Sequence, residues 1–210
     1  MKLIIVISIF FVLFGLIEIL QRWIKIKHEL TRKLAHIFSG VIILFLPNFL
    51  SAEEIVLLAV VFAVFLCISK YFGLLSSIHK IDRKTLGEVY FPLGIGISAF
   101  FFLPSHVLAF QFGILVLTFA DSLAGIIGET FGNHRIAFLA NKKSLEGTSA
   151  FFITTFLIIY FLEFPQPSFL FLPALTTTIL LTSVEVLLFA GLDNLFLPIL
   201  ATYIFIMFGL

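Results

Sequence analysis

A carboxylate and a series of glycines interrupt a long apolar segment in the middle of this chain of 210 residues. Asp121 is followed by Gly125, Gly128 and Gly132, so a helix would carry all four residues on one face. A charged group in an apolar helix is costly unless it is paired or hydrated, whereas carboxylate oxygens suit Mg²⁺ and glycines let a phosphate approach the backbone. Close helix packing through a GxxxG pattern would explain the glycines but not the acid. We therefore expect a magnesium and phosphate site here.

The segment "NKKSLEG" follows the glycines and ends at Gly147. Lys142 and Lys143 can neutralise a polyphosphate, Ser144 can donate a hydrogen bond to it, and Glu146 can bind a metal ion or a lysine. Taken alone, this loop could equally be a basic segment attracted to anionic lipid. The order of acid, glycines, basic loop and apolar helix is what a nucleotide site at a membrane surface requires. No Walker A sequence occurs in the chain.

Three further side chains occur in the segment "RKLAHIFSG". Arg32 and His36 are four residues apart and share a helical face, with Lys33 beside them. The two basic residues could bind phosphate or could anchor the helix at the membrane surface. His36 could bind phosphate, accept a proton or bond to a neighbouring helix.

Two late acids complete the candidate residues. Glu185 lies inside an apolar segment, and Asp193 follows at its end. We expect them to be additional carboxylates for a metal site.

The elements that must position these residues are membrane helices. Hydrophobic residues make up 61% of the chain and charged residues only 12%, which is too little polar surface for a soluble protein. The single cysteine excludes an intramolecular disulfide, and the first apolar run is long enough to be a retained span. We predict an all-α, polytopic helical bundle that forms one domain over residues 1–210, with about eight transmembrane helices. The predicted spans are 3–20, 34–50, 54–69, 90–104, 106–128, 149–163, 168–190 and 195–209.

Basic residues predict the orientation. Twelve of the 13 lysines and arginines lie in residues 21–33, 70–88 and 131–147, which fall on one face if the chain crosses eight times. We therefore expect this face to be cytoplasmic, the N-terminus to be outside, and the protein to lie in the plasma (inner) membrane.

Five segments together resemble the CTP-dependent lipid-alcohol kinases, the family of dolichol kinase, phytol kinase and CTP-using diacylglycerol kinase, which is related to phosphatidate cytidylyltransferase. They are "RKLAHIFSG", "GEVYFPLG", "ADSLAGIIGETFG", "KKSLEGTSAFF" and "VEVLLFAGLDN", in the order of the family. The resemblance implies that the active site contains Arg32, Lys33, Asp121, Gly128, Lys143, Glu146, Gly147, Glu185, Asp193 and Asn194.

The resemblance also implies transfer of the γ-phosphate of CTP to a membrane lipid alcohol, with Mg²⁺ as cofactor. The carboxylates expected at the metal are Asp121, Glu146, Glu185 and Asp193. The cations expected at the phosphates are Arg32, Lys33, Lys142 and Lys143. The hydroxyl proton would go to His36 or a nearby carboxylate.

Two other functions are alternatives to the kinase. A phosphatidate cytidylyltransferase would share the fold, but its longer Lys-Arg…Lys-Asp run ending in His-Gly-Gly is missing from the chain. A small transporter would need polar residues through the full thickness of the membrane, whereas here they gather toward one face. We expect no nucleic-acid partner, and a homodimer is compatible with the sequence.

Overall fold

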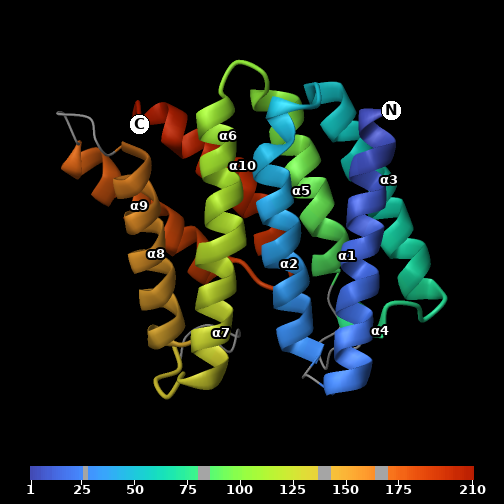
Figure 1. Cartoon of the computed structure of the whole chain (residues 1–210). Helices are drawn as coiled ribbons and strands as arrows, with labels where there is room; N and C mark the ends of the chain where they lie inside the picture. Colours follow the sequence, from blue (N-terminus) through green and yellow to red (C-terminus); the bar gives the residue numbers. More distant parts are fainter. Residues whose placement is uncertain (26–27, 80–85, 137–142, 164–169) are drawn as a thin grey trace.

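The computed structural model describes residues 1–25, 28–79, 86–136, 143–163 and 170–210, and within these ranges the regular elements are all helices (Figure 1). This confirms the predicted all-α class. The elements are α1 (Lys2–Ile24), α2 (His28–Phe45), η1 (Leu46–Asn48), α3 (Ala52–Tyr71), α4 (Ser76–His79), α5 (Gly87–Phe102), α6 (Val107–Leu115), η2 (Val116–Asp121), α7 (Ser122–Thr130), α8 (Leu145–Glu163), α9 (Phe171–Leu187) and α10 (Asp193–Met207).

The helices have the lengths of a polytopic membrane protein. In the described part of the chain, five helical segments are long and apolar enough to cross a bilayer: α1, α2 with η1, α3, the run from α6 to α7, and α8. The helices α5, α9 and α10 are apolar but shorter. Each of the eight predicted spans coincides with one of these segments, although the first residues of span 168–190 lie outside the described ranges.

Two apolar cores hold the bundle together. One lies among α1, α2, α3 and α5, and the other among α6, α8, α9 and α10. In the first, the rings of Phe10 and Phe62 have centroids 4.9 Å apart, and in the second those of Phe112 and Phe205 are 4.5 Å apart. Large apolar side chains also cover the outside, where Phe101 is 68% exposed. Such a surface suits lipid rather than water.

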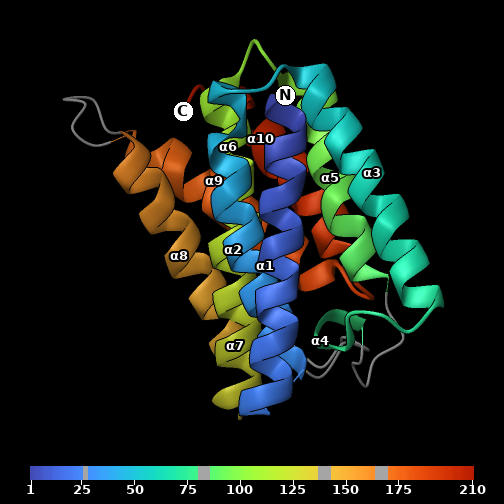
Figure 2. The same ribbon diagram turned by 45° about the vertical axis from the view of Figure 1, so that its right-hand side comes forward.

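Both chain termini lie at the same end of the bundle, and α4 and α7 lie at the opposite end (Figures 1 and 2). This arrangement agrees with the even number of crossings expected from the basic connections. Which end faces the cytoplasm stays a prediction.

A close approach between α2 and η2 positions the first half of the site. A Cβ atom at Gly40 would collide with the side chain of Thr118, so only glycine allows the two backbones to come this near. Lys33 lies two helical turns before Gly40, on the same face of α2. The contact therefore brings Lys33 beside Asp121, the last residue of η2.

Candidate active site

A cavity of about 590 Å³ opens among α2, η2, α7, α8, α9 and α10. Its volume falls in the range of small-molecule sites, about 300–1,000 Å³. Its wall carries nine charged side chains of both signs, which is unusual inside an apolar bundle. The basic ones are Arg32, Lys33, Arg135 and Lys143, and the acidic ones are Glu29, Asp121, Glu129, Glu185 and Asp193.

Lys33 and Asp121 form a buried ion pair in the wall of this cavity. The Nζ atom of Lys33 donates to Oδ2 of Asp121 at 2.9 Å and to the Asp121 main-chain oxygen at 3.3 Å. The two side chains are only 9% and 7% exposed. The carboxylate that the sequence predicts as a metal ligand is therefore balanced by a lysine from another helix, as buried charges require.

Gly125 makes room for that lysine. A Cβ atom at Gly125 would lie 2.7 Å from Cε and 2.8 Å from Nζ of Lys33. The missing side chain thus lets Lys33 extend along α7 toward Asp121. The group that comes close to the backbone at Gly125 is therefore the Lys33 side chain, whereas the sequence predicted a phosphate there.

The next glycines pack α7 against the start of α8. A Cβ atom at Gly147 would lie 2.7 Å from the main-chain oxygen of Ala124 and 3.2 Å from Cα of Gly128. Ser144 accepts a hydrogen bond from the N–H of Gly147 at 3.2 Å, so its hydroxyl caps the first turn of α8. The helix-packing interpretation therefore holds for Gly128, which packs against Gly147, although both glycines also line the cavity.

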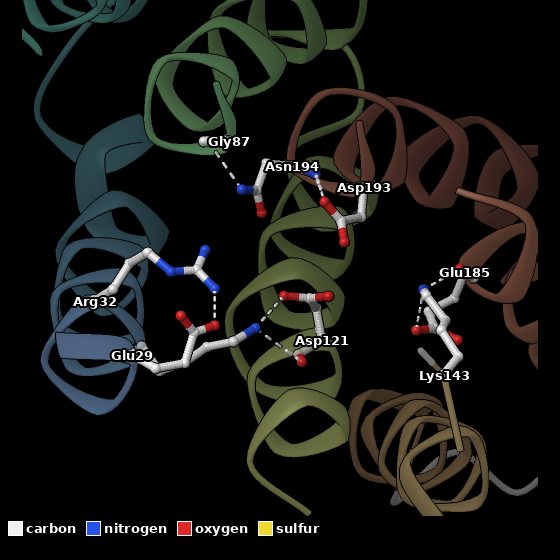
Figure 3. Close-up of polar contacts among 9 residues, drawn as sticks. Glu29, Arg32, Gly87, Asp121, Lys143, Glu185, Asp193 and Asn194 are labelled. Atoms are coloured by element: carbon white, nitrogen blue, oxygen red, sulfur yellow. Dashed lines mark hydrogen bonds and ion pairs between the residues drawn. The ribbon is translucent and has the colours of Figure 1, made fainter. Parts of the chain in front are cut away.

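On the opposite wall of the cavity, an ion pair between Lys143 and Glu185 joins the start of α8 to α9. The ammonium of Lys143, just before α8, donates to the carboxylate and to the main-chain oxygen of Glu185, near the end of α9 (Figure 3). The Oε2 atom of Glu185 is buried and has no hydrogen-bond partner among the described residues. Such an oxygen is available to a ligand that enters the cavity.

A tight turn places the start of α10 in the same wall. Gly191 has a φ of +86°, and a Cβ atom there would lie 2.6 Å from Cα of Gly87 on α5. Asn194 then donates from Nδ2 to the main-chain oxygen of Gly87 at 2.9 Å, and its own N–H donates to Oδ1 of Asp193 at 3.0 Å (Figure 3). These contacts fix Asp193 at the cavity and tie α10 to α5.

The cavity also contains residues that the sequence analysis did not assign to the site. Glu29 accepts a hydrogen bond from Nη2 of Arg32 at 2.5 Å, and Glu129 and Arg135 line the wall. Glu29 lies almost one helical turn before Arg32, and Glu129 directly follows Gly128. Their closeness in the sequence to predicted site residues was the one feature that could have indicated that they belong to the cavity.

Eleven of the predicted site residues lie together in this wall. They are Arg32, Lys33, Asp121, Gly125, Gly128, Lys143, Ser144, Gly147, Glu185, Asp193 and Asn194. Gly132 packs against Gly128 and Ser144 outside the lining residues. Lys142 lies outside the described residues.

Glu146 has different partners from those expected. Its carboxylate accepts hydrogen bonds from the N–H groups of Asn133 and His134, each at 3.2 Å, and lies 2.8 Å from Nδ1 of His134. These contacts tie the start of the α7–α8 connection to the first turn of α8, and Glu146 is not among the residues that line the cavity. A metal role for Glu146 stays a prediction.

His36 lines a second, apolar cavity of about 80 Å³ among α1, α2, α3 and α5. Its apolar wall includes Phe10, Phe14, Ile43, Leu46, Leu58 and Phe62. Arg32 and Asn194 belong to the walls of both cavities, so the apolar cavity adjoins the charged one.

The donor set fits a magnesium ion that arrives with a nucleotide. Among the residues that the structure describes, no three Asp, Glu, His or Cys side chains are close enough to hold a metal ion alone. Mg²⁺ is commonly bound by one or two carboxylates together with substrate phosphates. Asp121, Glu185 and Asp193 line the one cavity and can supply those carboxylates.

The chain is similar in sequence to known lipid-alcohol kinases. A phytol kinase of Synechocystis sp. is 30% identical over 193 residues, which cover 87% of this chain and 80% of the relative. An uncharacterized protein of Methanocaldococcus jannaschii is 31% identical over 185 residues, covering 84% of this chain and 92% of that protein. A dolichol kinase of Schizosaccharomyces pombe is 48% identical over 48 residues, which are 23% of this chain and 9% of the relative. Searches found no matching family model and no matching solved structure.

The fold and its cavity thus define a polytopic helical membrane protein with a charged interior cavity. With the phytol kinase matched over most of both chains, this chain belongs to the lipid-alcohol kinase family of phytol kinase and dolichol kinase.

Proposed function

We propose that this protein transfers the γ-phosphate of CTP to the hydroxyl of a membrane lipid alcohol, giving the lipid phosphate and CDP. The observation that carries the proposal is the charged cavity of about 590 Å³, which adjoins an apolar cavity through Arg32 and Asn194. A kinase that transfers phosphate from a nucleotide to a lipid needs one polar and one apolar compartment in contact. CTP as the donor is supported by the resemblance of the motifs.

The cations of the cavity would receive the triphosphate. Lys33 and Lys143 each bind a carboxylate in the structure. Phosphate oxygens, which are also anionic, can take the place of these carboxylates at the same ammonium groups. Arg32 and Arg135 add two guanidinium groups to the same wall. Phosphoryl transfer depends mainly on such positioning and charge neutralisation, because the protein performs little covalent chemistry.

The transfer step exchanges one P–O bond for another. The lipid hydroxyl oxygen forms a bond to the γ-phosphorus, the bond from that phosphorus to the bridging oxygen breaks, and its electron pair leaves with CDP. The hydroxyl proton passes to His36 or to a carboxylate at the meeting point of the cavities. A bound Mg²⁺, held by Asp121 with Glu185 or Asp193, would supply neutralisation of the phosphate charge.

The protein would lie in the plasma membrane, with its active site facing the cytoplasm. This orientation is supported by the basic residues in the connections at the end of the bundle opposite the termini. The diffusible nucleotide would then enter from the cytoplasm while the alcohol stays in the bilayer.

The test uses purified full-length protein in lipid nanodiscs with CTP labelled at either the γ or the α phosphate. We expect γ label in the extracted lipid and α label only in CDP. Lipid-bound α label would instead identify a cytidylyltransferase. The same assay with ATP and GTP tests whether CTP is the donor. The proposal requires faster transfer from CTP than from either of the other two nucleotides.

A further inference from the structure

We propose that the apolar cavity among α1, α2, α3 and α5 receives the hydroxyl end of the alcohol, and that the carboxylate of Glu88 binds its hydroxyl group. This inference rests on the proposed function, because it assumes that the acceptor is a lipid alcohol. It adds the place of the acceptor and a residue that touches the reacting oxygen.

Three buried polar atoms without partners belong to the wall of this one cavity. They are Nε of Arg32, Nε2 of His36 and Oε2 of Glu88, none of which has a hydrogen-bond partner among the described residues. Buried polar atoms normally find partners, so three at one apolar cavity indicate a missing polar group. A hydroxyl both donates and accepts, and it could donate to Glu88 while accepting from Arg32.

Glu88 is held in a way that leaves one oxygen free for this task. Its Oε1 atom accepts a hydrogen bond from Nζ of Lys70 at 2.6 Å and lies 3.3 Å from Nδ1 of His79. The other ring nitrogen of His79 lies 3.1 Å from the hydroxyl of Ser69. The side chain of Glu88 is only 3% exposed. The carboxylate is thus fixed through one oxygen and presents the other without a partner.

The position of Glu88 joins the apolar cavity to the phosphate site. Its neighbour Gly87 accepts the hydrogen bond from Asn194, a residue that lines both cavities. Arg32 is the other shared residue. An alcohol with its oxygen at Glu88 therefore has its reactive end toward the cavity assigned to the γ-phosphate.

The rest of the cavity suits the carbon atoms next to the hydroxyl group. Beyond Arg32 and His36, the wall continues along α2 to Ile43 and then to Leu46 of η1, and phenylalanines of α1 and α3 close it. Its volume of about 80 Å³ lies far below the range of sites that enclose a whole small molecule, about 300–1,000 Å³. The cavity therefore takes only the first few carbon atoms of the alcohol, and the remainder of the chain lies in the bilayer.

Photolabelling of the unmodified protein tests the location. Full-length protein in nanodiscs is irradiated with a C20 isoprenoid alcohol that carries a diazirine within the few carbon atoms nearest the hydroxyl, and labelled residues are identified by mass spectrometry. We expect adducts on the cavity wall, including α1 near Phe10 or α3 near Phe62, that excess unlabelled alcohol removes. Adducts confined to α8 and α9 would overturn the inference.

This labelling needs neither CTP nor turnover, so it separates the two proposals. Competed adducts in the apolar cavity, without phosphate transfer in the CTP assay, would reject the proposed function and keep the alcohol site. Phosphate transfer with adducts elsewhere would reject the site and keep the function.

Substitution of Glu88 tests the contact with the hydroxyl. For Glu88→Gln we expect the KM for the alcohol to rise about tenfold or more, while the KM for CTP stays within about twofold, because one charged hydrogen-bond partner of the alcohol is lost. The matched control is Glu18→Gln, which alters another buried carboxylate, one bonded to Ser76 and Ser77 outside both cavities. Equal kinetics for the two variants would show that Glu88 is only a structural ion-pair partner.

A second variant covers the case in which Glu88→Gln does not fold. Glu88→Asp keeps the charge that pairs with Lys70 but shortens the side chain. We expect the same rise in the KM for the alcohol, and an unchanged KM would overturn the role of Glu88.

Discussion

The Nζ atom of Lys33 lies 2.9 Å from the carboxylate oxygen Oδ2 of Asp121, although 88 residues separate them in the chain. The pair joins α2 to η2 inside an apolar bundle. Breaking a buried ion pair on one side costs about 3–5 kcal/mol, because the remaining charge has no partner. The two residues assigned to the phosphates and to the metal are therefore also partners in folding.

Asp121→Asn is expected to lower the rate of phosphate transfer roughly a thousandfold or more, because the amide cannot supply the charge that Mg²⁺ needs. The measurement is kcat with γ-labelled CTP. Thr118→Val is the control, since it keeps the volume of the side chain and Thr118 Oγ1 has no partner to lose among the described residues. An Asp121→Asn protein with activity within a few-fold of the wild type would contradict the metal-site assignment.

The same substitution is expected to lower the Tm, because Lys33 is left buried without its anion. Replacing Lys33 by Met together with Asp121→Asn should recover most of the lost stability without restoring activity. Thermal unfolding in detergent measures both variants. A double variant as unstable as the single one would show that the ion pair is not the source of the loss.

Gly125→Ala is expected to lower kcat/KM about tenfold or more and to lower the Tm as well. The added methyl group would meet the end of the Lys33 side chain, which would have to move away from Asp121 and so break the buried ion pair. Gly15→Ala is the matched control, because no atom of another residue lies within 4 Å of a Cβ placed there. Full activity for Gly125→Ala would mean that the position of Lys33 is unimportant for the reaction.

Lys143→Met is expected to raise the KM for CTP about tenfold or more, since one phosphate cation is lost, and to leave the KM for the alcohol nearly unchanged. Lys2→Met provides the control at the other end of the bundle. If both KM values rose together, Lys143 would act through the fold by way of its contact with Glu185.

The orientation can be checked with cysteines at the two ends of the bundle. In a Cys67→Ser background, Phe131→Cys and Ser105→Cys place exposed thiols in the α7–α8 and α5–α6 connections. A membrane-impermeant thiol reagent on intact cells should modify position 105 and spare position 131. The reverse pattern would place the site outside the cytoplasm.

The sequence was sufficient to predict the helices and most of the polar residues that line the candidate cavity, but not which residues they contact. The periodicity of Asp121 and Gly125 predicts that they share a helical face, because that property belongs to one helix. It does not say which other helix covers the face, so the role of Gly125 beside Lys33 was missed. Glu88 lay in a recognised segment, yet its free oxygen depends on contacts from α3 and α4 that only the fold brings together.

The expected roles of Glu146 and the glycines show the same limit. A carboxylate next to lysines suggests a ligand or an ion pair, whereas in the fold Glu146 holds the backbone of Asn133 and His134. Gly128 and Gly147 pack α7 against α8 and also line the cavity. From the spacing of the glycines in the sequence, these two roles look like alternatives.

The π-helical turn η2 has a consequence for how this long helix can change over time. A π turn contains one residue more than the α-helical turn it replaces, and such turns arise where a helix accommodates an inserted residue. Each residue of an α-helix advances the direction of the side chains by about 100°, given 3.6 residues per turn. Removing one residue from Val116–Asp121 would convert the π turn into an ordinary α-helical turn, so α6 would keep its face toward α10 and α7 its face toward α8. A single-residue deletion in this turn that spares Asp121 should therefore be tolerated better than a deletion in the α-helical turns on either side, where the loss of one residue rotates all the following side chains by about 100°.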